Sequence, residues 1–218
     1  MNFFSSTTIM MTTVAFVVSG TPVKIKARTT DADAIIGKTS QLYEKGGGMD
    51  ITFAANIYSG KNGTTFESFE GTIIMKKNKF ILTTPDMKTW FNGTTQWTYR
   101  SGEVYMTTPS GSDLRFLNPM ILLQDYKKDF NASYMGESTS AGAKMAYDIA
   151  LTPKKKDDIE KIEVQIEKNT SLPVKLVVTM RNNMRSTITI KDVRDSNPSD
   201  EIFTFPKAEY PDVEIFDL

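Results

Sequence analysis

The chain has 218 residues, a length that suits one domain, and its 26 Lys and Arg residues balance 26 Asp and Glu residues, so its net charge gives no sign of nucleic-acid binding or of a polybasic membrane patch. Histidine and cysteine are both absent, which excludes Ser-His-Asp and Cys-His catalysis, metal sites built on these ligands, disulfides and a lipid anchor on cysteine. We therefore expect no enzyme activity, no cofactor and no metal.

The N-terminal segment contains an apolar run from Ile9 to Val18, which is too short to span a bilayer as a helix and has the length of a signal-peptide hydrophobic region. We interpret residues 1–30 as a signal peptide, cleaved between Thr21 and Asp31. The same run also fits an extra buried strand or a misassigned start codon. Removal of residues 1–30 takes away three basic residues and no acidic one, which leaves a net charge of −3.

A helix is expected from Asp31 to Lys45. Its apolar face repeats at helical spacing and consists of Ala32, Ile35, Ile36, Thr39, Leu42 and Tyr43. Asp31 can cap the first turn, and the glycines at positions 46–48 end the helix.

From Ile51 onward the apolar period changes from 3.6 to 2, which is typical of β-strands. Short alternating segments are separated by turn signals such as Asn92-Gly93, and this spacing favours consecutive antiparallel neighbours. From the phase within each strand we expect one concave face to carry Phe53, Phe69, Ile73, Met75, Phe80, Trp97 and Tyr99.

A second helix is expected at Asn118-Pro119, because a capping residue precedes a proline at the first helical position. Its apolar side would consist of Met120, Leu122, Leu123, Tyr126 and Phe130. Alternation then resumes in segments centred on Ile149, Val164, Leu176 and Ile188, and the pair Phe203 and Phe205 is expected to close the series.

About ten strands with two or three helices favour a mainly β fold, in which a curved antiparallel sheet forms an unclosed half-barrel. Helices packed on its apolar face would act as a lid over an apolar cavity. The same pattern also fits a barrel whose interior is filled by its own side chains. No composition shift after Asp31 suggests a second domain, so residues 31–218 are expected to fold as one unit.

The run from Phe69 to Tyr99 reads FEGTIIMKKNKFILTTPDMKTWFNGTTQWTY. Its order of strand, basic hairpin, Pro-Asp turn and Asn-Gly hairpin resembles the LolA family of periplasmic lipoprotein carriers. The matching residues are Gly71, Ile73, Met75, Phe80, Pro85, Asp86, Trp90, Asn92, Gly93, Trp97 and Tyr99. Val104, the start of the second helix at Leu117-Asn118-Pro119 and the C-terminal residues 203–217 extend the resemblance over about residues 31–218.

The resemblance implies a soluble monomeric periplasmic chaperone that shields acyl chains of lipoproteins between the inner and the outer membrane. Its partners would be the lipoproteins, an inner-membrane ABC transporter and an outer-membrane acceptor. The cavity and lid residues that we infer are Ile51, Phe53, Phe69, Ile73, Met75, Phe80, Leu82, Trp90, Trp97, Tyr99, Val104, Met106, Met120 and Leu123.

One departure from the family pattern concerns the basic hairpin. Family members have an Arg-Pro pair where this chain has Lys76 and Lys77, and a lysine cannot form the planar multi-donor fork of arginine. This difference leaves open a periplasmic binding or sensor module for another lipid or a glycolipid. A third alternative is an enzyme that uses carboxylates or hydroxyls.

Overall fold

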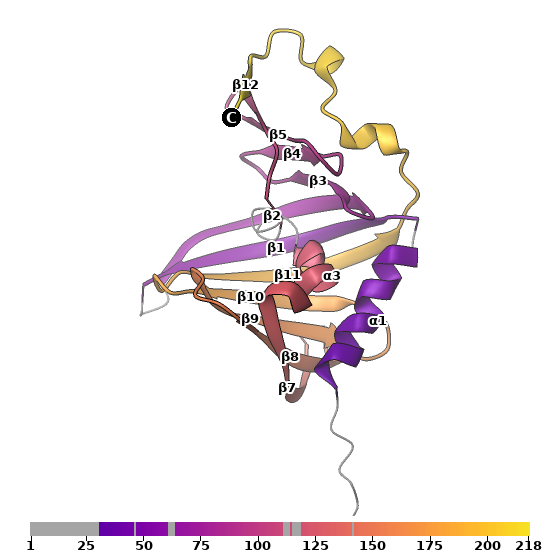
Figure 1. Ribbon diagram of the computed structural model, residues 1–218, viewed down its shortest axis with the longest axis vertical. Coiled ribbons are helices and arrows are strands. Elements are labelled where there is room, and N and C mark those ends of the chain that lie inside the picture. Colours follow the sequence, from indigo (N-terminus) through magenta and orange to yellow (C-terminus); the bar gives the residue numbers. More distant parts are fainter. Residues whose placement is uncertain (1–30, 46, 61–63, 111–113, 115–118, 141) are drawn as a thin grey trace, which may run out of the picture.

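The structure is a computed structural model, and it describes residues 31–218 except 46, 61–63, 111–113, 115–118 and 141 (Figure 1). The helices and strands are, in chain order, α1 (Ala32–Lys45), β1 (Met49–Ser59), β2 (Thr64–Lys76), β3 (Lys79–Thr83), β4 (Lys88–Phe91), β5 (Gln96–Arg100), β6 (Glu103–Thr107), α3 (Pro119–Asp129), β7 (Phe130–Thr139), β8 (Met145–Pro153), β9 (Ile159–Glu167), β10 (Pro173–Met180), β11 (Arg185–Asp195), the 3₁₀ helices η1 (Asp200–Phe203) and η2 (Lys207–Glu209), and β12 (Ile215–Asp217). Both expected helices are confirmed, and the second one begins at its proline. The N-terminal segment that we interpret as a signal peptide lies outside the described residues.

The strands form one sheet in the order β12-β6-β5-β4-β3-β2-β1-β11-β10-β9-β8-β7. Neighbouring strands are antiparallel, except that β12 runs parallel to β6. The edge strands β12 and β7 do not pair with each other among the described residues, so the sheet stays open. The expected mainly β fold with an unclosed antiparallel sheet is therefore confirmed.

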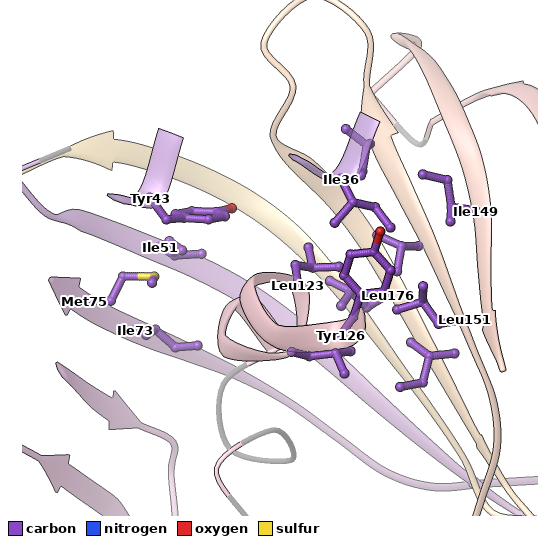
Figure 2. Packing of buried hydrophobic residues seen from close by; sticks show 14 of the residues in the cluster. Ile36, Tyr43, Ile51, Ile73, Met75, Leu123, Tyr126, Ile149, Leu151 and Leu176 are labelled. Carbon is purple, nitrogen blue, oxygen red and sulfur yellow. The ribbon is translucent and has the colours of Figure 1, made fainter. Parts of the chain in front are cut away.

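Both long helices lie on the same face of the sheet (Figure 1). They pack on the concave face in one large apolar cluster, to which strands from both halves of the sheet contribute (Figure 2). The cluster includes Ile36 and Tyr43 of α1 and Leu123 and Tyr126 of α3, each at most 4% exposed. Leu42 is the exception on the predicted face of α1, because it is 38% exposed.

A second, smaller cluster lies on the opposite face of the sheet. There the C-terminal segment packs Phe203 and Phe205 against Trp90, with the Trp90 and Phe205 rings 5.3 Å apart. Lys76 and Lys79 hold the same segment by ion pairs of 3.1 and 2.9 Å with Asp200. Lys76 also donates a hydrogen bond of 2.8 Å to the Pro198 carbonyl. This arrangement gives the outer face of β3–β6 an apolar cover.

Two expectations about the elements are corrected by the structure. Phe130 does not extend α3 but begins β7, a strand that the alternation did not reveal because small and polar residues fill it. Phe203 and Phe205 do not form a strand, since η1 ends at Phe203 and a coil follows it. Prolines at 198, 206 and 211 have no backbone N–H to donate to a neighbouring strand, which disfavours a long strand there.

Among the described residues, no helix is long and apolar enough to cross a membrane.

Candidate functional site

A cavity of about 340 Å³ opens in the concave face, beside α3 and away from α1. Its volume lies at the lower end of the range found for small-molecule pockets. The lining residues come from strands β1, β2, β3, β9, β10 and β11, from the turn between β3 and β4, from the β10–β11 turn and from α3. They are Ile51, Phe53, Ala55, Ile57, Phe69, Ile73, Leu82, Thr84, Met87, Leu122, Ile159, Ile162, Leu176, Val178, Met180, Met184, Ser186, Ile188 and Ile190.

The lining is almost entirely apolar. Thr84 and Ser186 are the two polar residues in it, and no charged residue of the described chain lines the cavity. It therefore lacks a carboxylate, lysine or histidine that could serve as an acid or base. What this arrangement can do is remove an apolar group from water.

The cavity is closed at one end and open at the other. Ile51 and Leu176 are at most 1% exposed at the closed end, whereas Met184 is 37% exposed. Exposure also increases along β10, from buried Leu176 to half-buried Met180. The open end therefore lies near the β10–β11 turn and the end of β1 that pairs beside it, at the side of the molecule opposite α1 (Figure 1).

A close approach of backbone and ring shapes the wall at β1 and β2. Phe53 pairs with Gly71 across the two strands, and a Cβ placed on Gly71 would lie 2.5 Å from the Phe53 ring and 2.7 Å from the Thr83 carbonyl oxygen. The Phe53 ring also meets Phe69 edge-on, with ring centroids 6.4 Å apart. The glycine that carries part of the family resemblance thus makes room for a cavity residue.

The two helices that cover the concave face are joined to each other and to the sheet by hydrogen bonds. Ser40 of α1 donates to the Leu123 carbonyl of α3 at 2.8 Å, and the Tyr126 hydroxyl donates to Asp33. The bond from Tyr126 lowers the pKa of Asp33, while burial raises the pKa of Tyr126. Thr39, which is fully buried, donates to the Ser171 carbonyl at 2.7 Å and ties α1 to the β9–β10 turn.

Of the cavity residues inferred from the sequence, five line the cavity: Ile51, Phe53, Phe69, Ile73 and Leu82. Met75, Phe80 and Leu123 belong to the same concave cluster but pack outside the lining. On α3 the lining residue is Leu122, the neighbour of the inferred Leu123. The side chain of Met120 lies outside the described residues.

The remaining five inferred residues lie on the other face of the sheet. Trp90 and Val104 are buried in the second cluster, and Trp97 and Tyr99 pack against it. Met106 pairs with Trp97 and so shares its face. The expectation that Trp97 and Tyr99 lie on the concave face is therefore wrong, because the register pairs Ile81 with Trp90 and Trp90 with Trp97.

Sequence reasoning missed the second half of the cavity wall. Strands β9, β10 and β11 and the adjoining turn contribute Ile159, Ile162, Leu176, Val178, Met180, Met184, Ser186, Ile188 and Ile190. The alternation of these strands was visible in the sequence, but their position in the sheet was not, because β1 pairs with β11, which lies far along the chain. That long-range pairing brings both halves of the wall together.

The geometry defines a class: an open antiparallel half-barrel with two covering helices and an apolar cavity. The family model for the outer membrane lipoprotein carrier protein LolA matches residues 22–184, and the chain belongs to this family. Among curated proteins no sequence matches.

Three solved structures show a distant similarity to the chain, each with a TM-score below 0.5. A LolA superfamily protein from Nitrosomonas europaea is 12% identical with a TM-score of 0.48, over 80% of this chain and 97% of that chain. A DUF1329 family protein from Desulfovibrio piger is 13% identical with a TM-score of 0.47, over 79% and 95%. LprF from Mycobacterium bovis is 13% identical with a TM-score of 0.44, over 78% and 96%.

Proposed function

We propose that the protein is a periplasmic chaperone that binds acyl chains of lipoproteins in its cavity and carries them from the inner to the outer membrane. The observation that carries this proposal is the cavity lining, in which 17 of 19 residues are apolar and the open end reaches the surface. Membership of the LolA family supports the same function. The donor would be an inner-membrane ABC transporter, and the recipient an outer-membrane acceptor.

Moving an acyl chain through water without a carrier would cost a large free energy. Each CH₂ group kept from water contributes about 0.8 kcal/mol, so a long acyl chain gains on the order of 10 kcal/mol from an apolar wall. The cavity supplies that wall and no reactive group among its described residues, which fits a binding protein that is not an enzyme.

The test is to purify the protein from the envelope of an expressing bacterium and to identify co-purifying molecules by native and lipid mass spectrometry. We expect lipidated proteins, and an N-terminus between Thr21 and Asp31 on the processed protein. Recovery of a free lipid or glycolipid without lipoproteins would favour the binding or sensor module instead. An intact Met1 on protein found in the cytosol would contradict a periplasmic carrier.

A further inference from the structure

The open end of the cavity is bordered by exposed apolar side chains. Phe66 is 73% exposed and lies in a bulge, because Ile57 pairs with Glu67 and Tyr58 pairs with Thr65. Ile57, which lines the cavity, pairs with Glu67, so Phe66 lies one residue further along β2 toward the open end. Met184 lines the cavity from the β10–β11 turn and is 37% exposed. Phe66 and Met184 thus place two exposed apolar side chains at the open end of the cavity.

Positive charge is concentrated beside these apolar residues. The β8–β9 loop (154–158) and the β10–β11 turn (181–184) together carry four Lys and Arg residues and two Asp residues, a net charge of +2. Residues 31–218 together have a net charge of −3, so the two loops are positively charged on a chain whose net charge is negative. Glu67 on β2 and Asp86 in the β3–β4 turn are acidic. The positive charge at the open end is therefore confined to the 154–158 loop and the β10–β11 turn.

The two basic loops form one surface. The Arg181 side chain donates to the Asp157 carbonyl at 2.8 Å, and the Arg181 backbone N–H donates to the Asp158 carbonyl at 2.9 Å. Lys155 and Lys156 are exposed on the same loop, and Ile159, which follows it, lines the cavity. Arg181 is therefore held against the 154–158 loop by backbone contacts, and the exposed Lys155 and Lys156 lie on the same loop.

We propose that the mouth of the cavity docks on the surface of an anionic lipid bilayer, with Phe66 and Met184 entering the interface and the 154–158 and 181–184 loops facing the headgroups. Exposed apolar side chains beside basic ones are the combination that binds anionic interfaces, where each Lys or Arg near the surface adds to the attraction. In this orientation an acyl chain passes between bilayer and cavity without crossing water. The inference rests on the proposed function, because only a lipid cargo needs that path.

The absence of cysteine allows a site-specific test. The variant Phe66→Cys, labelled with the environment-sensitive fluorophore NBD, is mixed with vesicles of phosphatidylglycerol and phosphatidylcholine or of phosphatidylcholine alone. The matched control is NBD on Leu218→Cys, which is 77% exposed and belongs to the C-terminal end beside β6. We expect a blue shift and an intensity rise at position 66 with anionic vesicles, and no change at position 218. Because each label reports its own position, binding through residues 1–30 alone would not produce this difference.

Charge reversal provides the second arm. Adding Lys155→Glu and Lys156→Glu to the labelled Phe66→Cys protein should weaken vesicle binding at least tenfold. Added salt should weaken vesicle binding by the labelled Phe66→Cys protein that keeps both lysines. The control Lys38→Glu with Lys191→Glu changes the net charge equally on exposed residues away from the mouth and should leave binding unchanged. The proposal would be overturned by an equal fluorescence change at positions 66 and 218, or by no change with anionic vesicles. It would also be overturned if both pairs of charge reversals weakened vesicle binding equally. The assay uses no cargo, so acyl binding in the cavity is measured separately and can persist when docking fails.

Discussion

At the scale of single residues, Gly71 has the sharpest steric requirement in the cavity wall. A methyl group there would lie 2.5 Å from the Phe53 ring and 2.7 Å from the Thr83 backbone oxygen, and the backbone oxygen cannot move freely. We expect Gly71→Ala to lower the free energy of unfolding by about 1–3 kcal/mol, measured by urea denaturation with circular dichroism.

The matched control for this substitution is Gly37→Ala in α1. A Cβ at Gly37 meets no atom within 4 Å, so alanine should stabilise the helix by about 0.5–1 kcal/mol. If Gly71→Ala were as stable as the wild type, the close packing of Phe53 on β2 would not constrain that position.

The residues also explain where prediction from the sequence stops. Alternation within β3 and β4 was ambiguous because both of their faces are buried: Phe80 and Phe91 face the helices, whereas Ile81 and Trp90 face the C-terminal segment. When both faces are apolar, only the register decides the side of each residue. Trp97 and Tyr99 were consequently placed on the wrong face, although Ile51, Phe53 and Ile73, on strands with one clear apolar phase, were placed correctly.

At the scale of elements, a charged hydrogen bond contributes to the contact between α1 and α3. Asp33 accepts from the Tyr126 hydroxyl and lies 3.4 Å from Lys127 Nζ, and its pKa is lowered from 3.8 chiefly by the bond from Tyr126. A lowered folded-state pKa stabilises the fold above the unfolded pKa, and this contribution is lost as the pH falls through the folded pKa.

We therefore expect Asp33→Asn to cost about 0.5 kcal/mol of unfolding free energy at pH 7, a modest value because the Asp33 side chain is half exposed. The difference from the wild type should shrink below pH 3.8 in urea titrations across pH. The exposed Asp212→Asn is the control and should match the wild type throughout. A constant difference from pH 7 to pH 3 would show that the charge of Asp33 does not stabilise the helix pair.

The C-terminal segment is a second element whose role can be measured. Phe203 is fully buried under β3–β6, whereas its neighbour Ile202 is 39% exposed. Phe203→Ala should lower the free energy of unfolding by about 3–5 kcal/mol, and Ile202→Ala should lower it far less. Equal small effects in urea denaturation would mean that the segment is dispensable for the sheet.

At the scale of the whole molecule, local patterns predicted the class of fold but not the pairings that bring the two halves of the cavity wall together. The hairpins from β1 to β6 and from β8 to β11 follow from alternation and turns, since they pair strands that are neighbours in the chain. The pairing of β1 with β11 and of β12 with β6 joins distant segments, and no local signal marks it. Because β11 follows β1 in the sheet, Ile188 and Ile190 face the cavity next to Ile51 and Phe53.

That arrangement permits a test of the cavity that leaves the core intact. Ser186 lines the cavity close to its open end, while the next residue, Thr187, points to the other face of β11. We expect Ser186→Phe to fill the space that an acyl chain needs and to weaken binding of a fluorescent fatty acid at least tenfold. Thr187→Phe adds the same ring outside the cavity and should bind like the wild type. Circular dichroism must show both variants folded, and a folded Ser186→Phe protein with wild-type affinity would place the acyl chain elsewhere.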